Sequence, residues 1–113
     1  MNLDFFKQTR ILDGGMGQEL LARGMDPTGT LWSAKALIET KYHQLIEDIH
    51  RDFIKAGAEV IVTATFTARR IRLRENGLEK QFENLNITAG KIAQNVKKIF
   101  LTYMLLVDCL HNI

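Results

Sequence analysis

Residues 42–66 read YHQLIEDIHRDFIKAGAEVIVTATF, and this stretch passes from a helical pattern to a strand pattern within a few residues. Its first part repeats apolar side chains at the spacing of one helix face, namely Tyr42, Leu45, Ile46, Ile49, Phe53 and Ala56. Gly57 then closes the predicted helix. Residues 58–66 are short and rich in β-branched residues, which is typical of a buried parallel strand.

The residues nearer the N-terminus predict another strand followed by a helix. Residues 11–13 are a short apolar run that ends in an acid and a glycine turn, which indicates a strand. Residues 18–23 predict a short helix with Gly24 just beyond its end. A turn is expected at residues 26–29, which read DPTG.

Further helices are predicted on both sides of the second strand. Ser33 is the expected N-cap of a helix that runs to Glu39, and residues 68–76 predict another helix that Gly77 ends. A long amphipathic helix follows, with an apolar face made of Leu78, Phe82, Leu85, Ala89, Ile92 and Val96. Strands that alternate with helices predict a parallel sheet, so the fold class is α/β.

The chain has 113 residues and one cysteine, Cys109, with a formal net charge of +2. A complete (β/α)₈ barrel needs roughly 250 residues, so two strands predict the start of a larger architecture. The small net charge predicts no nucleic-acid or membrane partner, and residues 1–10 do not resemble a signal peptide. One cysteine excludes an internal disulfide and a multi-cysteine metal site, and favours a cytoplasmic location.

The chemistry-bearing motif is Asp13-Gly14-Gly15, at the end of the first predicted strand. Ligands of parallel α/β folds bind at the carboxyl ends of the strands. Glycines let a ligand approach backbone N–H groups closely, and an acid offers a partner for an ammonium group. An ordinary turn explains the same spacing. A dinucleotide-binding fingerprint does not, because Leu20 stands where its last glycine is needed.

The chain resembles the homocysteine S-methyltransferase family, which includes enzymes that use S-methylmethionine or betaine and the homocysteine domain of methionine synthase. The resemblance fades after about Val96. It rests on four stretches in order, which are 11–24 (ILDGGMGQELLARG), 31–34 (LWSA), 45–63 (LIEDIHRDFIKAGAEVIVT) and 70–78 (RIRLRENGL).

The resemblance implies a (β/α)₈ barrel that transfers a methyl group to the sulfur of homocysteine, as in methionine biosynthesis. A zinc ion held by three cysteines activates the thiol in that family. The positions that match its substrate site are Asp13, Gly14, Gly15, Trp32, Thr63, Thr65 and Phe66. Homocysteine is then the expected partner, with S-methylmethionine the favoured methyl donor.

Departures from the family pattern limit what this chain is expected to do. The family often has Asn where Ala64 stands, and its zinc cysteines lie in later strands, so no catalytic or metal-binding residue and no bound zinc are expected here. Residues 1–98 form the barrel portion in this interpretation. Residues 99–113 are a divergent tail, explained either by a frameshift or by a divergent third strand at 105–107.

An inactive, truncated methyltransferase is therefore the functional prediction for the isolated chain. The alternative is a non-enzymatic module that oligomerises through open strand edges, and self-association is expected in either case. Two other clusters carry weaker signals: His43, Glu47 and His50 are interpreted as a solvated helix edge and not a metal face, and the arginines at 69, 70, 72 and 74 as a solvated surface.

Overall fold

The computed structural model describes residue 4 and residues 7–26, 29–99 and 104–106. Its helices are α1 (Met16–Ala22), α2 (Ala34–Ile38), α3 (His43–Lys55), α4 (Arg70–Glu75) and α5 (Phe82–Ile99). Two one-turn 3₁₀ helices, η2 (Thr40–Tyr42) and η3 (Glu79–Gln81), precede α3 and α5. The strands are β1 (Val60–Val62) and β2 (Met104–Leu106). In the described part, no helix combines the length and apolar character needed to cross a bilayer.

Glycines end the helices where the sequence predicts. Gly24 follows α1 with φ +105°, and its N–H donates to the carbonyl of Leu21 while the N–H of Met25 donates to that of Leu20. Gly57 ends α3 with φ +119° and the same pair of bonds, a conformation that residues with a Cβ rarely adopt. The predicted helix at 18–23 is confirmed, although it begins two residues earlier, at Met16.

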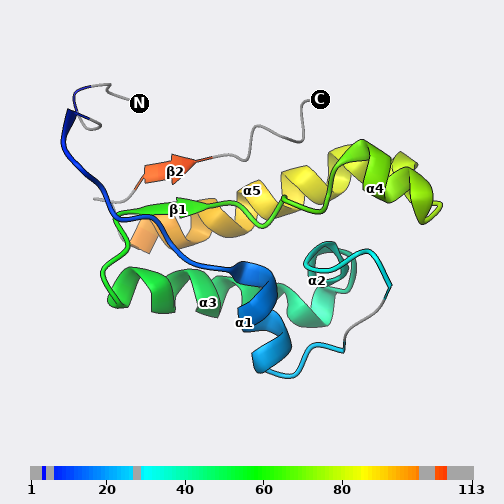
Figure 1. The fold of residues 1–113 in the computed structure, drawn as a ribbon, viewed down its shortest axis with the longest axis horizontal. Helices are drawn as coiled ribbons and strands as arrows, with labels where there is room; N and C mark the ends of the chain where they lie inside the picture. The colour runs from blue at the N-terminus through cyan, green and yellow to red at the C-terminus, as the bar shows by residue number, and fades with distance from the viewer. Residues whose placement is uncertain (1–3, 5–6, 27–28, 100–103, 107–113) are drawn as a thin grey trace.

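Three parallel segments lie side by side. β1 pairs with β2 in parallel, with Val60 opposite Met104, and Leu12 forms a parallel bridge to Val60 on the other side. The predicted first strand is thus an extended segment held by one bridge. Figure 1 shows α3 and α5 running alongside the β1/β2 pair, with α1 and α2 toward the end at which the chain leaves β1. The α/β class with parallel strands is confirmed.

The second strand is shorter than the predicted range of 58–66. After Val62 the backbone folds back, because the N–H of Thr65 donates to the carbonyl of Thr63 at 2.8 Å and the N–H of Ala68 donates to that of Thr65 at 3.0 Å. These turns use backbone groups that a longer ladder would need. The β-branched pattern therefore identified the strand and overestimated its length.

The core lies between α3, α5 and the helices that precede α3. Its fully buried side chains include Leu20, Ile46, Ile49 and Leu73, and Val96 belongs to a second, smaller cluster with Ile54, Ile61 and Ala93. His50 is also fully buried, so the prediction of a solvated edge at this position is wrong. His50 follows Ile49 directly and lies one turn after Ile46, which places it on the inward face of α3.

Ser33 precedes α2 as predicted, but its side chain does not cap the helix. The Ser33 hydroxyl instead lies 3.1 Å from Oγ1 of Thr67, and that Oγ1 accepts the N–H of Ala34 at 2.9 Å. Ser33 and Thr67 are both buried. Thr67 therefore ties the start of α2 to the loop after β1.

We expect the Thr67→Val variant to lose about 1–2 kcal/mol of unfolding free energy, because two buried hydrogen bonds disappear while the shape is kept. Urea denaturation at constant m-value measures this change. Thr30→Val is the matched control, since the hydroxyl of Thr30 makes an exposed bond with Asn76. Equal effects of the two changes would contradict the role given to Thr67.

Candidate functional site

Asp13 is held at the end of the first extended segment by bonds to β1. Its N–H donates to the carbonyl of Val60 at 3.1 Å, and its Oδ2 accepts the N–H of Val62 at 3.0 Å. The side chain is only 6% exposed. Burial raises the pKa of Asp13 above its usual range, and the bond from Val62 offsets part of that rise. The carboxylate is therefore fixed in place and poorly solvated.

Gly14 and Gly15 connect Asp13 to α1, for which Gly15 is the N-cap. A Cβ on Gly14 would lie 2.8 Å from Cε1 of Phe53 on α3, closer than such atoms approach in real structures. At Gly15 a Cβ would meet Gln18 atoms at 3.7 Å, which is ordinary contact. Close packing against the Phe53 ring is therefore what requires glycine at position 14.

We expect Gly14→Ala to destabilise the chain by about 1–2 kcal/mol, because the Phe53 ring must move to admit the new methyl group. Adding Phe53→Leu should recover part of the loss. Gly90→Ala is the control with the opposite sign: nothing lies within 4 Å of its added Cβ, so alanine in α5 should stabilise. Thermal melts of the variants measure both effects, and a neutral Gly14→Ala would contradict the clash.

A pocket of about 440 Å³ opens beside Asp13 and is lined by four separate segments of the chain, at residues 13–17, 32–33, 62–67 and 72. Of the predicted site residues, the structure brings six into its lining: Asp13, Gly14, Gly15, Trp32, Thr63 and Phe66. Thr65 is the exception. It is 1% exposed, and its hydroxyl lies 3.0 Å from that of Thr63, so it supports a lining residue from behind.

Two aromatic side chains border the pocket with much of their surface open. Trp32 is 50% exposed and Phe66 is 56% exposed, and the guanidinium of Arg69 lies 5.0 Å from the Phe66 ring centre. Trp32 has φ +50°, which is an outlier for a bulky residue. Strained backbone of this kind gathers at ligand sites, which fits the position of Trp32.

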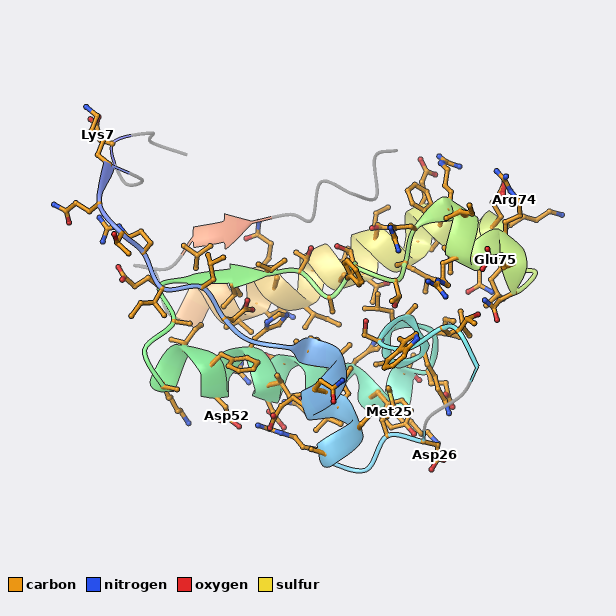
Figure 2. The ribbon with its side chains drawn as sticks, viewed as in Figure 1. Lys7, Met25, Asp26, Asp52, Arg74 and Glu75 are labelled. Atoms are coloured by element: carbon orange, nitrogen blue, oxygen red, sulfur yellow. The ribbon has the colours of Figure 1, made fainter. Side chains whose placement is uncertain are left out.

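Sequence reasoning missed several lining residues. Ser33, Val62, Thr67 and Arg72 all line the pocket. Arg72 lies in the first turn of α4, the short helix that follows the β1 loop, and a cation so close to the end of a strand was a usable signal. Instead the sequence suggested a solvated arginine surface. That description suits Arg74, which pairs with Glu79 and, as Figure 2 shows, lies at the far end of α4.

Comparison with known proteins shows the family of the chain. The sequence model described as homocysteine S-methyltransferase matches residues 10–109. The chain belongs to the homocysteine S-methyltransferase family. It is 39% identical over 92 residues to homocysteine S-methyltransferase 3 of Zea mays, covering 80% of this chain and 27% of that protein. It is 36% identical over 92 residues to homocysteine S-methyltransferase of Escherichia coli (strain K12), covering 80% and 29%.

The fold agrees with a solved structure of the same family. The metallated form of homocysteine methyltransferase MmuM from Escherichia coli matches with a TM-score of 0.77 and 30% identity. That match covers 94% of this chain and 39% of the other. The chain thus spans well under half the length of the family members to which it is similar.

The family match extends to residue 109, into the segment that the sequence analysis describes as a divergent tail. Strand β2, at Met104–Leu106, lies in this segment and pairs with β1. A divergent third strand and a shift of reading frame both stay predictions for residues 99–113, as does the domain boundary at residue 98. The downstream DNA distinguishes the first two, because a shifted reading frame requires the missing barrel strands to be encoded there.

The solved homocysteine methyltransferase MmuM is a metallated form, and a metal ion in this chain would need several ligand side chains close together. The described residues contain no group of three or more His, Cys, Asp and Glu side chains that could hold a metal ion. His43 Nε2 binds the carbonyl of Leu37, and Glu47 pairs with Arg51. Cys109 lies outside the described residues. These residues do not fit a zinc ion with three cysteine ligands.

Proposed function

We propose that this chain is the N-terminal, homocysteine-binding part of a (β/α)₈ barrel methyltransferase. That enzyme moves a methyl group to the sulfur of homocysteine and so forms methionine. The observation that carries the proposal is the pocket at the ends of two neighbouring parallel segments. It joins a buried carboxylate at Asp13 with the glycine backbone at 14 and 15. Family membership supports the same reaction.

Each end of an amino acid has a matching group in the pocket. The carboxylate of Asp13 can pair with the substrate ammonium group, and the low solvation of this carboxylate strengthens the ion pair. The backbone at Gly14 and Gly15 allows close approach of the substrate carboxylate. Thr63 offers a hydroxyl that Thr65 orients. The thiol end then extends toward the aromatic border.

The methyl donor we propose is S-methylmethionine. A sulfonium cation is attracted to exposed aromatic faces, and Trp32 and Phe66 supply two of them. Arg72 adds a cation to the lining, which suits the carboxylate of such a donor. A cytoplasmic location belongs to this proposal, because one cysteine in 113 residues is usual for a reducing compartment.

The isolated chain should not perform the reaction. The nucleophile is the thiolate, and a free thiol has a pKa of about 8.5, so little thiolate is present at neutral pH. In the complete family zinc supplies that activation, and the residues of this chain do not fit it. The described residues therefore account for substrate binding and not for activation of the thiol.

The experiment supplies the purified chain with homocysteine, S-methylmethionine and zinc, and measures methionine, bound metal and homocysteine affinity. We expect homocysteine binding, no methionine above the protein-free blank and no stoichiometric zinc. A phosphate-binding barrel would instead bind sugar phosphates, and such binding without binding of homocysteine would overturn the proposed substrate. Methionine formation with bound zinc would overturn the proposed inactivity.

A second candidate is a non-enzymatic module of several copies. The observation in its favour is that, within the described residues, the Leu12 segment and β2 each pair on one side only, with β1 between them. Unpaired edges invite strands of another copy. Light scattering after size exclusion distinguishes the two: a defined assembly that ignores homocysteine favours the module.

A further inference from the structure

His50 lies beneath the proposed substrate site and is enclosed completely. It belongs to α3, which packs along β1, and its exposed fraction is 0%. Within the part of the chain that the structure describes, neither Nδ1 nor Nε2 has a hydrogen-bond partner. Buried polar atoms are almost always paired, so two such atoms on one ring require an explanation.

The geometry of the ring points to Asp13. Nδ1 of His50 lies 4.0 Å from Oδ2 of Asp13. That oxygen already accepts the N–H of Val62, and a carboxylate oxygen has room for a second donor. A hydrogen bond needs about 2.7–3.2 Å, so a movement of roughly 1 Å would complete it. Bonds of this kind are often long without substrate and shorten in the complex.

We propose that His50 is a positioning residue: its Nδ1–H group holds Oδ2 of Asp13 and so directs Oδ1 to the substrate ammonium group. The inference rests on the proposed function, because that function makes Asp13 the ammonium ligand. His50 itself does not line the pocket. Its action is therefore on the carboxylate, and the ring has to carry its single proton on Nδ1.

Nitrogen NMR of the imidazole rings tests the proton position directly. His43 is an internal reference, because its Nε2 lies 2.8 Å from the carbonyl of Leu37, which only accepts, and must carry a proton. We expect the opposite tautomer, Nδ1–H, for His50 at pH 7, and a shift of that signal in Asp13→Asn. An Nε2–H tautomer that Asp13→Asn leaves unchanged would overturn the inference.

Two variants separate positioning from packing. His50→Asn keeps an amide N–H close to the place of Nδ1, whereas His50→Leu fills the space without a donor. We expect homocysteine affinity to fall about tenfold in His50→Leu and to stay within about threefold in His50→Asn. In an Asp13→Asn background, His50→Leu should add less than about twofold. Equal affinities of the Asn and Leu variants would contradict the role.

The two proposals fail in different ways. If the unaltered chain does not bind homocysteine, the proposed function is wrong, and the tautomer of His50 still decides whether it holds Asp13. If the unaltered chain binds homocysteine while His50 carries its proton on Nε2, the site stands and the positioning role is wrong.

Discussion

The Asp13→Asn variant should bind homocysteine at least about 30-fold more weakly than the unaltered chain. Removing one partner of a buried, hydrogen-bonded charge pair costs about 2–5 kcal/mol, and each 1.4 kcal/mol is a factor of ten in affinity. Asparagine keeps an oxygen that can accept the N–H of Val62, so the contact between position 13 and β1 should be kept. Isothermal titration with L-homocysteine measures the loss.

The matched control is Asp26→Asn, which removes a carboxylate from an exposed residue in the loop after α1, labelled in Figure 2. Asp26 does not line the pocket, so its change should leave affinity within about twofold.

Thermal stability of Asp13→Asn should be equal to or higher than that of the unaltered chain. The reason is that burial of the ionised carboxylate raises the pKa of Asp13 and is therefore unfavourable to the fold. Unchanged affinity in Asp13→Asn would remove Asp13 from the site.

Much of the fold follows from local signals in the sequence. Gly24, Gly57 and Gly77 end their helices because only glycine adopts their positive φ without strain, and that requirement is visible in the sequence. The length of β1 could not be predicted from the sequence. It depends on the turns at Thr63 and Thr65, where backbone groups bond within the loop and leave the ladder.

Residues that depend on tertiary contacts were the ones predicted less well. Ser33 was expected to cap its own helix, but Thr67 reaches the same place from 34 residues further along the chain. Family resemblance placed Thr65 in the lining, whereas the structure places it behind Thr63. In the sequence, His50 resembles a polar residue at the edge of a helix. Its burial becomes evident only when the Asp13 segment packs against α3. Long-range packing decides each of these positions.

The same His50 should make the chain sensitive to acid, with a loss of about 3 kcal/mol of stability between pH 6.5 and pH 4. Burial lowers the pKa of His50 from 6.5 to about 4. Between these values the unfolded chain binds a proton that the folded chain does not, so stability falls as pH falls. Each pKa unit of difference between the folded and the unfolded chain is worth about 1.4 kcal/mol of stability. Urea unfolding across this range measures the slope.

Asp13 acts with the opposite sign, because its pKa is raised in the folded chain and its protonation therefore favours the fold as the pH falls. Comparison with His50→Asn isolates the histidine, since that variant keeps the carboxylate and has no imidazole to titrate. We expect the variant to lose most of the slope between pH 6.5 and pH 4. His43→Asn should keep it. A slope that persists in His50→Asn would mean that other groups cause the acid sensitivity, and that His50 is not held neutral beneath the carboxylate.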